Sequence, residues 1–492
     1  MAELLKTEPP QIAERAKASE SRGTLRVAAP LVVALVIVLL PAPSGLSVNA
    51  WRYFGLFAGV VVGIIAEPIP AAAVGLLGVV LAAVLGLVHT EVGEATDWAL
   101  SGFGNDTVWL IFAAYMLALG YAKTGLGKRI ALLLIRRLGR RTLGLGYAIA
   151  LADLFLAPFM PSSTARSGGT IYPIISNIPG LFGSKPHDAS RSKIGSYLMY
   201  TALATTCVTS CIFLTGHASN LLALSLIAET THVTITRADW FKGFAPVGII
   251  LFPLVPLLLY KIYPPEIKES PDASQWARDE LQSLGPMTKR ERTMLVLAMG
   301  ALGLWIGGGE YIEAAIAAIL IILLMVILGV VSWDDILRNT SAWNMLIWFA
   351  TMVTLARGLA EVKFVQWVGQ AIGPALVDLH SSAAIVLVVG AFFYMHYLFA
   401  STSAHTSALL PVFLGVAALI PGVSPMTGAL LLAYPLGLIG ILTPYGIGPS
   451  PIYYGGGYIP GRDFWIFGFI LGLIFFLVYM AIIIPWLAFL NF

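Results

Sequence analysis

The stretch PFMPSSTARSGGTIYPIISN, residues 158–177, breaks the pattern of the membrane segment in which it lies. Long apolar runs flank it on both sides, so we expect it at or near the depth of the hydrocarbon core. It nevertheless contains prolines, three consecutive hydroxyl residues, an arginine and a pair of glycines. Irregular polar backbone is tolerated at that depth only where protein buries it or where it lines a water-filled cavity. The stretch is therefore a candidate binding site.

A second interrupted stretch, ASTSAHTSALLP at residues 400–411, lies in the other half of the chain. Two more breaks follow these stretches, TGHASN at 215–220 and TPYGIGPSP at 443–451, each within an apolar segment. Interrupted membrane segments in corresponding positions of two halves are typical of secondary transporters, which bind their substrates at the breaks.

The composition is that of a polytopic membrane protein. Of the 492 residues, 58% are hydrophobic and 11% are charged, whereas roughly 25% of an ordinary soluble domain is charged. The lipid bilayer is thus an expected partner, and the formal charge of +3 is too small to indicate a nucleic-acid partner. Cys207 and Cys211, the two cysteines, lie one helical turn apart in an apolar segment. They are interpreted as small packing residues and support neither a disulfide framework nor a metal site.

The first 26 residues are polar and carry charges of both signs. Transit peptides are poor in acidic residues, and a signal peptide has its apolar core much nearer the start. We therefore predict that residues 1–26 form a cytoplasmic tail and that the protein lies in a bacterial inner membrane.

Apolar runs of about 20 residues predict an all-α polytopic membrane protein with about eleven crossings and two re-entrant hairpins. The fourth crossing follows an acidic loop that contains Glu91 and Asp106, and it precedes the densest positive cluster, Lys123 to Arg141. The positive-inside rule then places the N-terminus in the cytoplasm and, after eleven crossings, the C-terminus on the periplasmic side. The short basic segment 130–138 is predicted to lie along the inner interface. The crossings are expected near residues 27–42, 52–68, 71–88, 107–122, from 194, 243–263, 293–308, 311–331, 342–358, from 426, and 465–490.

The chain is predicted to consist of two halves with inverted-topology repeats. Residues 105–109 resemble residues 339–343, residues 162–165 resemble 401–404, and Thr215 and Thr443 each open a helix break. These pairs are separated by a nearly constant number of residues, as an internal repeat requires. The predicted organisation is a first half at 27–263 with a hairpin at 144–178 and a broken helix at 194–228, a polar cytoplasmic linker at 264–292, and a second half at 293–492 with a hairpin at 382–419 and a broken helix at 426–455.

Hydroxyl residues stand at both predicted hairpin tips, and each set precedes an apolar run. They could cap half-helices whose free N–H groups and positive dipole ends favour an anion. The alternative is that they only satisfy local backbone within a kinked helix. The predicted binding residues at the tips are Ser162, Ser163 and Thr164 in the first, and Ser401, Thr402 and Ser403 in the second.

Arg166 favours the functional interpretation, because an unpaired arginine in the membrane interior costs at least roughly 2.5 to 3.5 kcal/mol. The alternative is that Asp153, thirteen residues earlier, pairs with it across the hairpin. His405 follows the second tip and His217 lies in the first helix break, so three possible cations surround one proposed cavity and indicate an anionic substrate. Asn220, Thr443 and Pro444, which lie in the two helix breaks, complete the predicted binding set.

Several long motifs identify a resemblance to a known family. MPSSTARSGGTIYPI, TGHASN, TPYGIGPSPIYYGGGYI and GFGNDTVWLIFAAYMLALGYAKTGLGKRIA resemble the divalent anion:sodium symporter family, in its branch of 2-oxoglutarate/malate translocators and citrate/succinate exchangers. The resemblance covers about residues 30–490. It implies a homodimer held by scaffold domains and transport domains with two hairpins that move as elevators.

The family's hairpin tips carry Ser-Asn-Thr motifs that bind substrate carboxylates and help to form two sodium sites. In this chain the middle position is Ser163 in the first tip and Thr402 in the second, so an asparagine carbonyl that could bind sodium is missing twice. Our hypothesis is that Arg166 and His405, beside the altered tips, replace bound sodium in neutralising a dicarboxylate. If the protein is sodium-coupled instead, the resemblance implies metal sites near Ser162, Ser163, Ser401 and Thr402.

The sequence therefore predicts a sodium-independent exchanger of di- or tricarboxylates such as 2-oxoglutarate, malate, succinate or citrate, with no cofactor. Sodium-coupled symport of the same substrates is the alternative. A channel is disfavoured, because the breaks are local and apolar helices flank them. An enzyme is not predicted, because no nucleophile elbow, phosphate loop or metal-ligand spacing is present.

Overall fold

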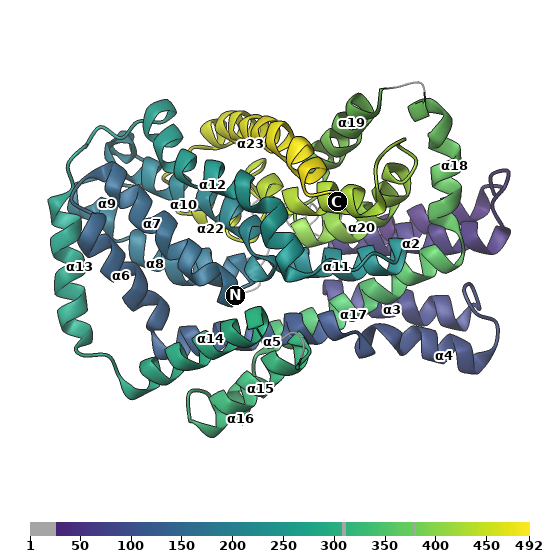
Figure 1. Cartoon of the computed structure of the whole chain (residues 1–492), viewed down its shortest axis with the longest axis horizontal. Coiled ribbons are helices and arrows are strands. Elements are labelled where there is room, and N and C mark those ends of the chain that lie inside the picture. The colour runs from purple at the N-terminus through teal and green to yellow at the C-terminus, as the bar shows by residue number, and fades with distance from the viewer. Residues whose placement is uncertain (1–25, 308–310, 378–379) are drawn as a thin grey trace, which may run out of the picture. The chain divides into compact units, whose positions relative to one another are not determined.

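The structure is a computed structural model that describes residues 26–307, 311–377 and 380–492 (Figure 1). Within these ranges every regular element is a helix, apart from one isolated bridge between Arg141 and Glu269. The predicted all-α class is thus confirmed. Six helices of the described residues are long and apolar enough to cross a membrane, and the count of eleven crossings remains a prediction. The six are Val48–Ala66, Val92–Thr124, Thr142–Phe159, Arg237–Ile262, Ser381–Leu398 and Gly461–Phe489.

Contacts within the chain define two compact units, and each draws on both predicted halves. The smaller falls within Met1–Phe103 and Ile347–Val368. Tyr53 Oη donates to the Leu355 carbonyl at 2.7 Å and so ties the start of this unit to its second segment. The acidic loop expected before the fourth crossing is largely the helix α4. The helices of this unit are Arg26–Leu39, α2 (Val48–Ala66), α3 (Ala71–Val84), α4 (Val92–Leu100) and most of α17 (Thr340–Glu361).

The larger unit, Gly104–Leu346 and Gly369–Phe492, contains both interrupted hairpins and both broken helices. Its first segment, Gly104–Leu346, contains the helices α5 (Asp106–Thr124), α6 (Leu126–Leu138), α7 (Thr142–Leu156), η3 (Thr164–Ile171), α8 (Tyr172–Ile175), α9 (Ile178–Leu181), α10 (Gly195–Ile212), α11 (Ala218–Thr231), α12 (Arg237–Ile262), α13 (Pro271–Leu284), α14 (Lys289–Gly307), α15 (Ala314–Ile327) and α16 (Trp333–Leu337). They are followed by most of α18 (Phe364–Val377), α19 (Ser381–Tyr394), α20 (Thr402–Ala417), α21 (Pro425–Ala433), α22 (Ser450–Gly455) and α23 (Gly461–Phe489).

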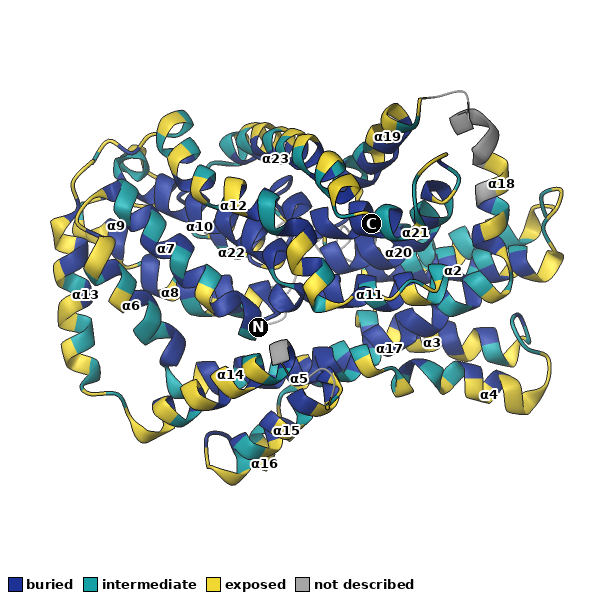
Figure 2. Cartoon of the chain, in the orientation of Figure 1, coloured by how far each residue is buried: buried dark blue, intermediate teal, exposed yellow. Residues whose placement is uncertain are grey.

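Helix α10 is the centre of the larger unit. All of its residues from Gly195 to Ile212 are buried, and it packs against α7 and α12 (Figure 2). Cys207 and Cys211 are free thiols inside this packing. Trp240 of α12 donates its indole N–H to the Cys211 carbonyl at 2.8 Å. Because α10 carries many threonines and serines, it brings hydroxyl groups into the interior, where they need polar partners.

The polar segment expected to be a linker contains the helix α13, which packs along the predicted interfacial helix α6. Side chains at its start donate to the last turn of α6 and the residue that follows it: Ser270 Oγ to the Gly139 carbonyl at 2.8 Å and Ser274 Oγ to the Arg136 carbonyl at 2.6 Å. Thr142 at the start of α7 donates its N–H to the Lys268 carbonyl at 2.9 Å. This segment is therefore an ordered part of the larger unit.

The far end of α13 is fixed by Arg129 of α6. Its Nε and Nη2 lie 2.6 and 3.2 Å from the two carboxylate oxygens of Glu291, and Nη1 donates to the Gly285 carbonyl at 3.0 Å. Burial opposes the ionisation of Glu291, but hydrogen bonds from Arg129 and Thr288 outweigh it and lower the pKa of this carboxyl below its ordinary value.

We expect Arg129→Gln to lower the free energy of unfolding by about 2 kcal/mol, between the values for exposed and for buried ion pairs. Because the folded pKa of Glu291 is lowered, its contribution is complete above the ordinary carboxyl pKa and is lost as the pH falls through the lowered value. Thermal unfolding in detergent at neutral and at acidic pH measures both effects. The exposed Arg137, which has no ion pair in the described structure, provides the control Arg137→Gln. An equal loss of stability in both variants would contradict this assignment.

Candidate functional site

The first hairpin has its tip at a non-helical segment between two helices. Helix α7 passes through a short 3₁₀ turn, Ala157–Phe159, into the non-helical residues 160–162, and the π-helix η3 begins at Thr164. Ser162 Oγ accepts the N–H of Ala165 at 3.2 Å, and its carbonyl accepts the N–H of Arg166 at 2.8 Å. Arg166 and the glycines after it are helical, so the non-helical break is confined to residues 160–162.

The second hairpin repeats this arrangement. Helix α19 is followed by the 3₁₀ turn Met395–Leu398, by extended backbone to Ser401, and then by α20. Ser401 Oγ accepts the N–H of Ala404 at 3.5 Å, the counterpart of the Ser162 bond in the first hairpin. Both tips therefore present the N-terminus of a helix that a serine caps, at the positions that the internal repeat predicts.

Arg166 is buried and forms an ion pair with Asp153 of α7, from Nε to Oδ2 at 3.1 Å. Asp153 also accepts hydrogen bonds from the hydroxyl groups of Thr206, at 2.9 Å, and of Thr209 in α10. The pairing across the hairpin, which the sequence left open as an alternative, is the arrangement in the structure. The positive charge of Arg166 is thus offset within the protein.

The other N–H groups of the guanidinium donate to backbone carbonyls and to hydroxyl groups of α10. Nη1 donates to the Met160 carbonyl of the tip at 2.8 Å and to the Gly216 carbonyl of the first helix break at 2.6 Å. Nη2 donates to the hydroxyls of Thr206 at 3.3 Å and Ser210 at 3.0 Å. With the bond to Asp153, all five N–H groups are used. In this structure Arg166 therefore has no N–H left for a carboxylate ligand, which favours a positioning role over the predicted role as a direct ligand.

The first helix break, between α10 and α11, is bonded to the first tip. Thr215 Oγ1 donates to the Pro158 carbonyl at 2.8 Å, and Ala218 donates its N–H to the Pro161 carbonyl at 2.9 Å. Asn220 bridges the break, because its Nδ2 donates to the Ser210 carbonyl at 2.7 Å. Its Oδ1 is buried and has no partner among the described residues.

The second tip is bonded to the same helix break. His217 Nε2 lies 2.7 Å from Thr402 Oγ1, and Ser219 Oγ lies 3.1 Å from Thr402 Oγ1 and 2.8 Å from Ser403 Oγ. His217 and Ser219 stand at the start of α11, and Thr402 and Ser403 at the start of α20, which packs along α11. The predicted site residues of the second tip and of the first break thus meet.

The second helix break joins the same assembly. His396, beside the second tip, has Nε2 2.9 Å from the Gly446 carbonyl. At the first tip, Thr164 lies against Gly448 so closely that a Cβ at Gly448 would collide with its hydroxyl group. Ser167 Oγ lies 3.0 Å from Tyr453 Oη of α22. Both tips and both breaks therefore belong to one contact network.

His405 lies in α20, one turn beyond the second tip, and it is buried among rings. Its centroid is 4.4 Å from Phe392, 5.3 Å from Phe399 and 5.2 Å from His396. Neither of its ring nitrogens has a hydrogen-bond partner in the part of the chain that the structure describes. It is thus the one predicted cation whose polar atoms are both without a protein partner there.

The remaining predicted residues lie at the tips or in the second break. Ser163 is buried beside Ser162, and Thr164 is exposed. Thr443 is buried, its hydroxyl group has no partner among the described residues, and Pro444 is a half-buried turn residue beside it. Sequence reasoning missed the hydroxyl groups of α10. Thr206, Thr209 and Ser210 share one face of an apolar helix, and this spacing could have indicated the polar contact with Asp153 and Arg166.

Two helix N-termini converge in this network, and both carry hydroxyl side chains. The charges of Arg166 and Asp153 cancel each other, so free backbone N–H groups, helix dipoles and hydroxyls remain as the groups that can bind an anion. Such donors suit a ligand with two carboxylates, one for each helix N-terminus.

The chain matches the family described as sodium:sulfate symporter transmembrane region over residues 22–492. It is 44% identical over 474 residues to proteins named L-tartrate/succinate antiporter from Escherichia coli (strain K12) and Shigella flexneri, covering 94% of this chain and 97% of each relative. It is also similar in fold to the YdaH transporter of Alcanivorax borkumensis, with a TM-score of 0.54, 15% identity, and coverage of 82% of this chain and 91% of that chain. For MtrF of Neisseria gonorrhoeae the TM-score is 0.53 and the identity 14%, covering 83% and 93%.

We expect Arg166→Lys to unfold at a lower temperature than the unaltered protein, although it keeps the positive charge. A lysine has three N–H donors and cannot replace five bonds from a planar group. Leaving buried partners unpaired costs about 3 kcal/mol or more. Thermal unfolding in detergent measures the loss. The control is Arg338→Lys, at an exposed arginine paired with Asp334 at 3.0 Å, and equal unfolding temperatures for the two variants would contradict the structural role.

Proposed function

The chain belongs to the sodium:sulfate symporter family, the divalent anion:sodium symporters, and on that premise we propose that it exchanges dicarboxylates across the membrane. The observation that carries the proposal is the convergence of two serine-capped hairpin tips in one network of neutral donors. Relatives that align along nearly the whole chain are named for tartrate and succinate, both of which are four-carbon dicarboxylates. The proposed substrates are di- and tricarboxylates and include succinate, malate, 2-oxoglutarate and citrate.

We propose that the two substrate carboxylates bind at the N-termini of η3 and α20. The direct ligands are the hydroxyl and backbone N–H groups of Ser162, Ser163, Thr164, Ser401, Thr402 and Ser403. His217, Asn220, Thr443 and Pro444 surround them in the two helix breaks. Arg166 acts as a positioning residue, since its bonds fix the Met160 and Gly216 carbonyls on either side of the first tip.

Sodium-independent exchange requires that protein groups offset the charge of the substrate. Ser163 and Thr402 stand where the family has asparagine, so each tip lacks an amide carbonyl that could bind sodium. Arg166 is already neutralised by Asp153, which leaves His405 as the group for this task. We propose that His405 is protonated when a dicarboxylate is bound, because a buried positive charge is tolerated only beside an anion. The titratable group that lies against its ring is His396, and its other ring neighbours are phenylalanines.

We further propose an elevator-type transport movement and a homodimer, as the family resemblance implies. The bonds among tips and breaks support a movement in which these segments travel together. The proposed location is a bacterial inner membrane, with the N-terminus in the cytoplasm and the C-terminus in the periplasm. The positive residues of the α5 to α7 segment, followed by the polar α13 segment, support this orientation.

Exchange and symport are distinguished by uptake of radiolabelled succinate into proteoliposomes in sodium or in choline buffer. We expect uptake only when the vesicles contain unlabelled dicarboxylate, at equal rates in both buffers. Without a bound anion, the helix N-termini and hydroxyl groups of the tips lack partners at membrane depth, so the empty carrier crosses poorly and returns only with a second anion. Uptake into empty vesicles that a sodium gradient drives would instead establish the alternative, sodium-coupled symport, which the family's description favours.

We expect Thr402→Val to weaken exchange strongly while the protein stays folded. The substitution keeps the shape but removes a hydroxyl group that is proposed to bind a carboxylate and that pairs with His217. Losing such a bond costs about 1 to 3 kcal/mol, or roughly 5- to 150-fold in succinate affinity. The control is Thr406→Val, one turn further along α20, where the hydroxyl group only donates to the Thr402 carbonyl at 2.7 Å. Half-saturating succinate concentrations for exchange compare the two variants. Similar half-saturating concentrations for both variants would show that the second tip is not part of the binding site.

A further inference from the structure

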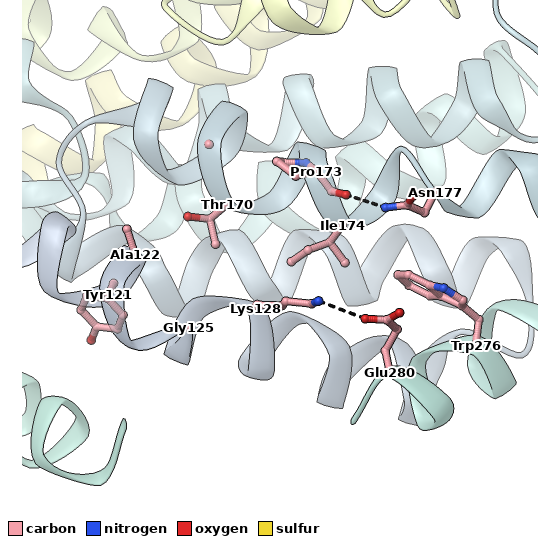
Figure 3. A pocket seen from close by; sticks show the side chains of 11 residues that line it. Tyr121, Ala122, Gly125, Lys128, Thr170, Pro173, Ile174, Asn177, Trp276 and Glu280 are labelled. Atoms are coloured by element: carbon pink, nitrogen blue, oxygen red, sulfur yellow. Dashed lines mark hydrogen bonds and ion pairs between the residues drawn. The ribbon is translucent and has the colours of Figure 1, made fainter. Parts of the chain in front are cut away.

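A hollow of about 390 Å³ lies behind the first hairpin, away from its tip. Three layers surround it: the returning arm of the hairpin, the junction of α5 and α6, and the helix α13 (Figure 3). All of them belong to the larger unit, so this hollow, which we call the rear cavity, lies within one compact body. Its lining residues are Tyr121, Ala122, Gly125, Lys128, Gly169, Thr170, Pro173, Ile174, Asn177, Trp276 and Glu280.

Of the described residues that line the rear cavity, Lys128 and Glu280 are the two that carry charge. Lys128 Nζ of α6 and Glu280 Oε2 of α13 lie 3.0 Å apart, and their side chains are 44% and 34% exposed. Figure 3 shows the two side chains pointing toward one another, with the Trp276 ring next to Glu280. The pair is thus open to solvent, and such exposed pairs contribute at most about 1 kcal/mol.

The rear cavity and the first tip lie on the same short helix. Gly169 and Thr170 line the cavity, whereas Thr164 stands at the tip, five and six residues earlier in η3. Because a π-helix closes its hydrogen bonds between residues five apart, little more than one turn separates the two places. An anion held at the cavity would therefore be close to the proposed binding site without occupying it.

We propose that the rear cavity is an access subsite, in which Lys128 binds one carboxylate of the dicarboxylate before it reaches the hairpin tips. This inference rests on the proposed function. The incoming carboxylate replaces Glu280 as the partner of Lys128, which a weak exposed pair permits. Glu280 then repels the anion and keeps it from being held too firmly to move on. By the positive-inside rule, this subsite serves the cytoplasmic face.

A purely structural pair predicts a different outcome for its variants. If Lys128 and Glu280 only stabilise the packing of α13 on α6, removing either charge weakens the same contact. The half-saturating succinate concentration then changes in the same direction in both variants. An access subsite instead predicts opposite signs. Loss of Lys128 removes the attraction for the substrate, whereas loss of Glu280 removes a competitor and leaves Lys128 free to bind.

The test measures succinate exchange in inside-out and right-side-out membrane vesicles that contain the full chain. Lys128→Gln should raise the half-saturating concentration at the cytoplasmic face about three- to fivefold, the factor expected for one exposed charge pair, and Glu280→Gln should lower it. The maximal rate should not change in Lys128→Gln, because the tips are intact, and should fall in Glu280→Gln, because Lys128 then releases the anion more slowly. Lys128→Arg, which keeps the charge, should retain the behaviour of the unaltered protein, and added salt should reduce the differences.

The matched controls are Lys123→Gln and Asp335→Asn, which break a neighbouring ion pair outside the rear cavity. Lys123 is also 44% exposed, and Asp335 is its partner. The access subsite is supported if only the Lys128 and Glu280 variants shift, in opposite directions. It is overturned if Lys128→Gln matches Lys123→Gln, or if both cavity variants shift in the same direction. Failure of the unaltered protein to exchange succinate at all would refute the proposed function instead.

Discussion

The buried ion pair between Arg166 and Asp153 is the constraint on which the rest of this site depends. An arginine inside a membrane protein must have every donor satisfied, and here one side chain joins α7, α10, the first tip and the first helix break. Thr206, Thr209 and Ser210 of α10 have polar partners in the interior because this pair supplies them. Removing the pair would leave the polar atoms of three segments without bonds, so tip geometry and stability are coupled.

Because Arg166 fixes the first tip to the first break, the second tip can be positioned through that break. His217 and Ser219 carry the connection to Thr402 and Ser403, and Gly448 lets the second break approach Thr164. The candidate site is thus built from paired donors on a framework in which Asp153 offsets the charge of Arg166. Such a framework suits an exchanger, which must bind successive anions of similar charge without keeping either.

The sequence was sufficient to predict where the helices are interrupted, because clustered hydroxyl, glycine and proline residues interrupt a membrane helix and need protein around them. The binding role of the tips remains a prediction. The family predicted from the motifs is confirmed by the match along the chain. The partner of Arg166 could not be decided from the sequence, because pairing with Asp153 depends on how the hairpin bends. The helices α4 and α13 were missed because their charged residues were interpreted as loop signals, although Ala273, Ala277 and Glu280 share one face of α13. The two-half organisation remains a prediction of the repeat.

The central claim is that the tips bind the dicarboxylate while Arg166 remains bonded to protein groups alone. An experimental structure of the protein with bound succinate tests it most directly. We predict that the two carboxylates contact the starts of η3 and α20, and that Arg166 keeps its bonds to Asp153, Met160 and Gly216. A structure in which Arg166 has left Asp153 and binds a carboxylate of succinate would contradict it.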